Sequence, residues 1–105
     1  MERRLLESTP YEGLKNGSHI DVEVYYTKGG ANYISGGTTP RGYYLSATPV
    51  TYKNGMASTV LFNGMKKLLM PANRYSAKQF EQAVNKGREE APELIKLVLD
   101  KEKAA

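Results

Sequence analysis

A chain of 105 residues has room for one domain, and its 40% hydrophobic and 25% charged residues are typical of a soluble globular protein. The sequence has no cysteine and one histidine, which excludes disulfides, thiolate chemistry and any site that needs two imidazoles. It also has no apolar run of about 18 residues and no signal-peptide pattern at its start, so we expect a cytoplasmic protein without a membrane span.

The net charge of +4 is unevenly distributed along the chain. No acidic residue lies between Glu23 and Glu81, and this window holds seven basic residues and seven of the eight tyrosines. A basic segment interleaved with aromatic residues suits single-stranded nucleic acid, whose bases stack on rings. Two other interpretations stay open, because tyrosine is a good strand former and is also enriched at protein interfaces.

The first 18 residues are expected to form a flexible N-terminal segment. Residues 2–7 are amphipathic and could form a single helical turn, and turn-forming residues follow. A single α+β domain is then expected over residues 19–105, with a sheet at 19–75 and helices at 76–103.

The sheet region reads as a β-meander. Residues 19–26 alternate strictly, with Ile20, Val22, Val24 and Tyr26 on one face. A short strand is expected around residues 32–34, followed by a loop over residues 36–42 and a strand over residues 43–52. Because proline cannot donate to a ladder, Pro49 predicts that this last strand is at an edge or bulged.

Two Asn-Gly pairs divide the rest of this region. Asn54-Gly55 predicts a hairpin whose returning strand covers residues 56–62. Residues 65–70 follow the second pair and could form a strand or a helical turn, of which we favour the strand.

The C-terminal region is helical. Ser76 and Gln79 have the spacing of a capping box, and Pro92 suits the first turn of a second helix. The fold class expected is therefore α+β, an antiparallel β-meander of four to five strands followed by one or two C-terminal helices. A helix across one face of the sheet would leave the other face for a ligand. The second helix carries more apolar surface than a short terminal helix needs, which favours a homodimer; its apolar residues are Leu94, Ile95, Leu97, Val98 and Leu99.

One group of residues could support catalysis. His19, Asp21 and Glu23 share a strand face and include the ligand types of several metal sites. Side chains on one strand face are about 7 Å apart, however, which is wide for one metal, and a solvated face explains the pattern equally well. No phosphate-binding glycine motif is present. We expect no enzymatic activity, no cofactor and no metal.

The candidate binding residues are the basic and aromatic residues of the acid-free window. Arg41 lies beside Tyr43 and Tyr44 at a strand start, where its guanidinium could stack on a ring or contact phosphate. The full set is Lys28, Tyr33, Arg41, Tyr43, Tyr44, Tyr52, Lys53, Lys66, Lys67 and Arg74. The expected partner is single-stranded DNA or RNA, or a host protein that handles nucleic acid.

Two resemblances accompany these residues. The pattern Lys28-Gly29-Gly30, Asn32-Tyr33, Gly36, Arg41-Gly42-Tyr43-Tyr44-Leu45-Ser46 and Pro49-Val50 resembles small uncharacterised proteins of phages and conjugative elements of gut bacteria. That resemblance covers about residues 20–80 and implies an accessory protein of a mobile genetic element, a kind that includes inhibitors of CRISPR nucleases.

The expected order of strands followed by a helix is similar to the Pur-alpha and Whirly families, which bind single-stranded nucleic acid. This chain lacks the second strand-helix repeat of Pur-alpha. The resemblance therefore implies a homodimer that would complete the architecture.

Overall fold

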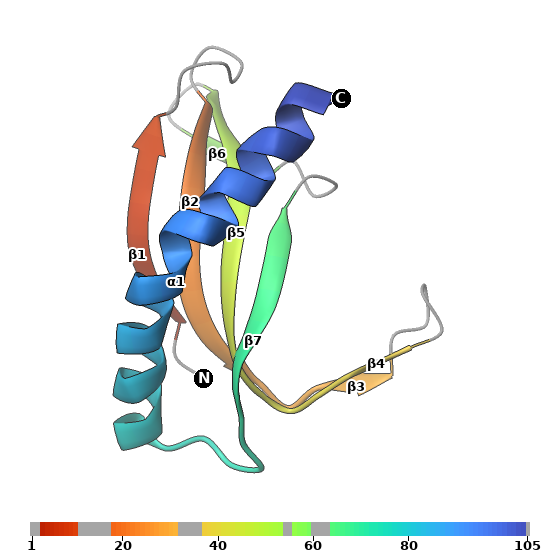
Figure 1. Ribbon diagram of the computed structural model, residues 1–105, viewed down its shortest axis with the longest axis vertical. Coiled ribbons are helices and arrows are strands. Elements are labelled where there is room, and N and C mark those ends of the chain that lie inside the picture. Colours follow the sequence, from red (N-terminus) through yellow and green to blue (C-terminus); the bar gives the residue numbers. More distant parts are fainter. Residues whose placement is uncertain (1–2, 11–17, 32–36, 54–55, 60–63, 105) are drawn as a thin grey trace.

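The computed structural model describes residues 3–10, 18–31, 37–53, 56–59 and 64–104 (Figure 1). Seven strands and one helix lie within these ranges, which confirms the predicted α+β class. The elements are β1 (Arg3–Pro10), β2 (Ser18–Thr27), β3 (Gly30–Ala31), β4 (Thr38–Thr39), β5 (Gly42–Lys53), β6 (Met56–Thr59), β7 (Met65–Pro71) and α1 (Ala77–Ala104).

The main sheet has five antiparallel strands and is organised around β5 (Figure 1). Along one edge β5 pairs with β2, and β1 pairs with the far edge of β2. The other edge of β5 is shared by two strands, because β7 pairs with residues 42–47 and β6 with residues 50–53. The antiparallel β5–β6 pair confirms the returning strand over residues 56–59, and β7 confirms the preference for a strand at residues 65–70. The Asn54-Gly55 turn and residues 60–62 lie outside the described residues.

The expectation for Pro49 is wrong, because β5 is central and its register shift lies between Tyr43 and Tyr44. Pro49 is paired with Ile20 of β2 on one side. On the other side it lies where the partner of β5 changes from β7 to β6. A residue without an N–H group is tolerated at such a break in the ladder.

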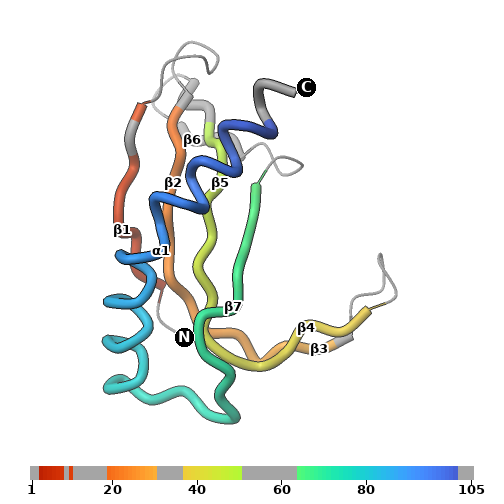
Figure 2. The backbone as a smooth tube through the Cα atoms, in the orientation of Figure 1, coloured from red at the N-terminus to blue at the C-terminus, as the bar shows by residue number. Residues whose placement is uncertain are grey.

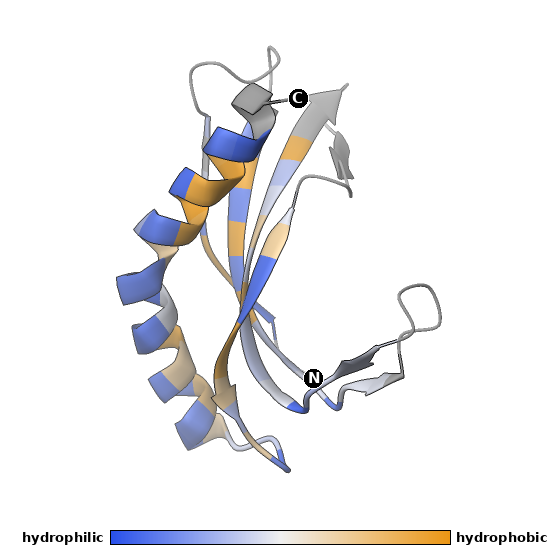
Figure 3. Cartoon of the chain, turned by 45° about the vertical axis from the view of Figure 1, so that its right-hand side comes forward, coloured by the Kyte–Doolittle hydropathy of each residue, from blue (hydrophilic) through white to orange (hydrophobic). Residues whose placement is uncertain are grey.

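One face of the sheet is apolar and packs against α1. The alternation predicted for β2 is confirmed, since Ile20, Val22, Val24 and Tyr26 are all buried on this face. Tyr43, Leu45 and Ala47 of β5 extend the same core, which α1 covers with Phe80, Val84, Leu94 and Val98 among others. Figure 3 shows the hydrophobic residues of α1 turned toward the sheet and the hydrophilic residues turned away.

The expected second helix is absent from the described residues, because α1 runs through Pro92 without a break. Proline inside a helix removes one backbone hydrogen bond and commonly bends the axis. Figure 2 shows the axis changing direction about midway along α1. Pro92 and Arg88, whose carbonyl loses its partner, are both exposed, so water can take the place of the missing bond.

The start of α1 confirms half of the predicted capping box. Gln79 donates its backbone N–H to the Ser76 hydroxyl at 3.2 Å. The Ser76 N–H, which a capping box would pair with the Gln79 side chain, instead donates to the Tyr43 hydroxyl at 2.8 Å. This bond joins the helix cap to the central strand.

The N-terminal segment is a strand and not a helical turn. Residues 3–10 form β1, which pairs with β2 along its whole length and belongs to the same sheet as the rest. The Arg4 guanidinium binds the Glu81 carboxylate through two bonds and lies 5.2 Å from the centre of the Phe80 ring. These contacts join β1 to α1.

Beyond the main sheet, β3 and β4 continue β2 and β5 as a narrow two-stranded arm that bends away (Figure 1). Gly29 lies at the bend with a φ of 71°, and a Cβ there would meet the carbonyl oxygen of Thr39 at 2.2 Å. Only glycine fits this close approach. The strand expected at residues 32–34 lies outside the described residues.

Most of the apolar surface that suggested a homodimer is covered within one chain. Leu94, Ile95 and Val98 are buried against the sheet, and Leu97 is the one large apolar residue of the described part of α1 that is exposed, at 45%. A homodimer stays a prediction, but it is no longer needed to bury the apolar residues of α1. No helix in the described ranges has the length and apolar character needed to cross a bilayer.

Candidate functional site on the open face of the sheet

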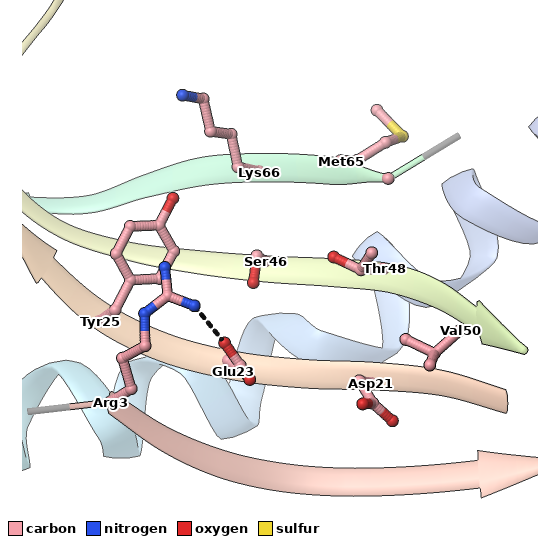
Figure 4. Close-up of a pocket in the computed structure, with 10 residues that line it drawn as sticks. Arg3, Asp21, Glu23, Tyr25, Ser46, Thr48, Val50, Met65 and Lys66 are labelled. Atoms are coloured by element: carbon pink, nitrogen blue, oxygen red, sulfur yellow. Dashed lines mark hydrogen bonds and ion pairs between the residues drawn. The ribbon is translucent and has the colours of Figure 1, made fainter. Parts of the chain in front are cut away.

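The sheet face opposite α1, here called the open face, carries the alternate residues of the same strands. A hollow of about 550 Å³ lies on this face, lined from four strands and the residue before β7. Figure 4 shows its lining side chains. The lining residues are Arg3 from β1; Asp21, Glu23 and Tyr25 from β2; Ser46, Thr48 and Val50 from β5; and Gly64, Met65 and Lys66. A volume of this size is within the range of small-ligand sites.

A stack of four side chains, Arg3, Tyr25, Tyr44 and Lys66, runs across the strands beside this hollow. The two tyrosine rings are 5.8 Å apart and nearly parallel, with an interplanar angle of 16°. The Arg3 guanidinium lies 4.6 Å from the centre of the Tyr25 ring, and Lys66 Nζ lies 5.7 Å from that of Tyr44. Because β2 and β5 lie between β1 and β7, each cation covers an outer side of the tyrosine pair.

Burial of the tyrosine pair affects its acidity. Burial raises the pKa of Tyr25, while the nearby Arg3 charge partly opposes this. Burial also raises the pKa of Tyr44, whose hydroxyl donates to the carbonyl of Pro40 at 2.7 Å. Both hydroxyls are therefore neutral over the physiological range, and each keeps its donor.

Two carboxylates lie on the open face, and both are paired. Glu23 accepts a bond of 2.9 Å from Arg3, and Asp21 accepts one from the Ser8 hydroxyl. His19, Asp21 and Glu23 share this face as the alternation predicts. The described residues contain no group of three or more acidic or histidine side chains placed to hold a metal ion.

Three of the predicted basic residues gather at one end of the sheet, where the arm begins. Arg41 donates from Nε to the carbonyl of Lys28 at 3.1 Å and from a terminal nitrogen to the carbonyl of Asn73 at 3.3 Å. These bonds bring together the segments that carry Lys28, Arg41 and Arg74, all of which are exposed.

Other predicted site residues lie elsewhere. Tyr43 is fully buried beneath α1, with an exposed fraction of 0%, so it packs in the core and not on a binding surface. Tyr44 is on the open face but is only 4% exposed. Lys67 lies on the helix side of β7 and pairs with Glu90, which raises the pKa of its ammonium group. Tyr33, and the side chains of Tyr52 and Lys53, lie outside what the structure describes.

Sequence reasoning missed Arg3, Tyr25, Ser46 and Thr48. The last three follow from the alternation of β2 and β5, since every second residue opposite a buried one must share the open face. Arg3 was missed because its segment was read as a helical turn. The sequence could also have assigned Lys66 and Lys67 to opposite faces of the sheet, because they are adjacent in a strand.

Comparisons of this chain with protein-family models, with curated proteins and with solved structures find no match. The open face must therefore be interpreted from its own geometry.

Proposed function

We propose that this protein is a non-enzymatic module that binds single-stranded nucleic acid on the open face of its sheet. The observation that carries the proposal is the stack of Arg3, Tyr25, Tyr44 and Lys66 beside a hollow of about 550 Å³. Antiparallel sheets that combine aromatic and basic side chains on an uncovered face suit flexible strands, because bases stack while cations contact phosphates.

The covered rings change how stacking would occur. Arg3 and Tyr44 lie against the two sides of Tyr25, so a base does not insert beside that ring. The Arg3 side chain is 64% exposed, however, and the outer face of a guanidinium is itself a stacking surface for a base.

Phosphate contacts come from the cations that border this surface. Lys66 is exposed on β7, and Lys28, Arg41 and Arg74 are exposed where the arm begins. A strand that runs from the hollow toward the arm would pass these cations in turn. Neutralising its phosphates releases counterions, so binding should weaken steeply as salt increases.

The adjacent lysines of β7 provide a matched test, read by fluorescence anisotropy with a labelled oligonucleotide at several salt concentrations. Lys66→Ala should weaken binding to every sequence and reduce the salt slope by about one. Lys67→Ala removes the same charge from the opposite face and should leave affinity unchanged. Equal losses in both variants, or binding that salt does not weaken, would contradict the proposed interface.

A second candidate function is a protein-binding accessory factor, such as an anti-CRISPR-like inhibitor of a host enzyme that handles nucleic acid. The observation in its favour is that both sides of Tyr25 are covered, since a protein partner needs no free ring. Arg3 and Tyr25 would then be interface anchors. A host protein retained through nuclease treatment and high salt, and released by Arg3→Ala, would favour this candidate. The origin in a mobile element stays a prediction from the resemblance in sequence.

A further inference from the structure

The two banks of the hollow differ in charge. On the side of β1 and β2 lie the carboxylates of Asp21 and Glu23 and the guanidinium of Arg3, so carboxylates outnumber cations there. On the side of β7 lies the ammonium of Lys66. Between them the floor carries the hydroxyls of Ser46 and Thr48 (Figure 4). A site for phosphate alone would not place two carboxylates beside its ligand, because like charges repel.

The polarity of a nucleotide is complementary to that of the hollow. Its phosphate is anionic, and several bases carry N–H donors on the opposite end of the molecule. From this match, and resting on the proposed function, we infer that the hollow binds one nucleotide of a single strand. The phosphate faces Lys66, and a donor-bearing base faces the carboxylate of Glu23.

The carboxylate can take this role although it already pairs with Arg3. The ion pair uses Glu23 Oε2, and a carboxylate has about four lone-pair positions, so both oxygens can accept further bonds. The Glu23 side chain is 29% exposed and stays accessible from the hollow. Glu23 lies directly beside the Arg3 stacking surface through their ion pair, whereas Asp21 pairs with Ser8, so Glu23 is the better placed of the two to select the base.

Guanine fits this acceptor best among the four bases. Its N1–H and N2 amino groups lie side by side and match the two oxygens of one carboxylate, which gives a pair of charge-assisted hydrogen bonds. Cytosine and adenine present one amino group each. Thymine presents a single N–H between two carbonyl oxygens, which the carboxylate repels. The hydroxyl of Ser46 or Thr48 can donate to guanine O6.

The test measures the affinity of the full chain for oligothymidylate and for the same strand with guanine, inosine or cytosine at its central positions. The guanine strand should bind about tenfold more tightly than the thymine strand. Inosine lacks the N2 amino group and should bind with intermediate affinity. Glu23→Gln should abolish the preference for guanine, because an amide cannot accept two N–H groups side by side.

Glu89→Gln is the matched control, since it removes the same charge from an exposed position of α1 on the other side of the sheet. It should keep the preference. Wild-type protein that binds every strand alike, or a Glu23→Gln variant that binds more tightly but still prefers guanine, overturns the inference and leaves the proposed function standing. Failure of the wild type to bind any of the strands refutes the proposed function itself.

Discussion

The two faces of the sheet differ in what their side chains do, although each strand supplies both faces by simple alternation. The face beneath α1 is buried and apolar, with Val22, Val24 and Leu45 at exposed fractions of 0% and the rings of Tyr26 and Tyr43 in the same core. The open face carries the ion pair of Arg3 and Glu23, hydroxyls and a stack of rings between cations. One face forms the core, and the other carries polar groups at the surface, where we propose that a ligand binds. Substitutions should therefore separate into losses of stability and losses of binding.

The largest effect is expected at Gly87, where α1 packs against buried side chains of the sheet. A Cβ at Gly87 would meet a methyl of Val24 at 2.8 Å and one of Leu45 at 3.3 Å. Because those side chains are fully buried, Gly87→Val should lower the free energy of unfolding by about 3 kcal/mol, measured by urea denaturation. Gly64→Val at the edge of the hollow should cost far less, since its Cβ would make ordinary contacts. Comparable losses would show that the two faces are equally packed.

The next effect concerns the hydroxyl of Tyr43. It accepts the Ser76 N–H and donates to the Ser76 carbonyl oxygen at 3.1 Å, so it takes the part that the Gln79 side chain would have in a capping box. Tyr43→Phe keeps the ring and leaves the Ser76 N–H without its partner, while the Ser76 carbonyl still accepts the Phe80 N–H at 2.8 Å. It should cost about 1–2 kcal/mol in the same assay. Tyr25→Phe on the open face should cost less. If Tyr43→Phe leaves the free energy of unfolding unchanged, water replaces the hydroxyl at this cap.

The neighbouring arginines of β1 face opposite sides and allow a direct comparison. Arg4→Ala removes the bonds to Glu81 and the contact with Phe80, so it should lower stability by about 1 kcal/mol. Arg3→Ala should change stability less and weaken oligonucleotide binding. Thermal unfolding measures stability, and fluorescence anisotropy measures binding. A loss of stability in Arg3→Ala together with a loss of binding in Arg4→Ala would contradict our assignment of the two faces.

The smallest effect is a dependence of stability on pH. Burial raises the pKa of Tyr25 in the folded state above the value of about 10 expected when it is unfolded. The neutral hydroxyl thus contributes stability that is fully present below about pH 10 and is lost as the pH rises through the folded pKa. Tyr25→Phe removes the ionisable group and keeps the ring. Its melting temperature should fall less steeply than that of the wild type above about pH 10; parallel curves would contradict the raised pKa.

The sequence was sufficient to predict the elements in which one face is dry. In β2 every second residue is buried, so apolar and polar residues alternate strictly in the sequence. At the start of α1 the cap is a serine hydroxyl, which the sequence identifies directly. The strand β1 was not predicted because its alternation of inward and outward residues is interrupted. The register shifts between Leu5 and Glu7, so Leu5 is exposed while its neighbour Leu6 packs against the core. Two adjacent leucines then imitate a helical pattern.

The continuity of α1 through Pro92 and the composition of the site depend on tertiary contacts that no local pattern reports. Proline is unfavourable inside a helix, but the burial of Leu94, Ile95 and Val98 against the sheet outweighs the missing hydrogen bond. The predicted site was drawn from the acid-free window alone. Arg3 and Glu23 lie outside that window and reach the open face through strand pairing, which the distribution of charge could not indicate.

The placement of α1 at the end of the chain order has a consequence for synthesis in the cell. The strands of the main sheet leave the ribosome before the helix that covers them, and α1 supplies seven of the fifteen residues of the buried core cluster. Until residues 77–104 emerge, the nascent sheet presents Ile20, Val22 and Val24 to its surroundings without a covering layer. Such uncovered apolar sheets are the species that aggregate or recruit chaperones. Translation that stalls before α1 is complete should therefore yield a product prone to degradation.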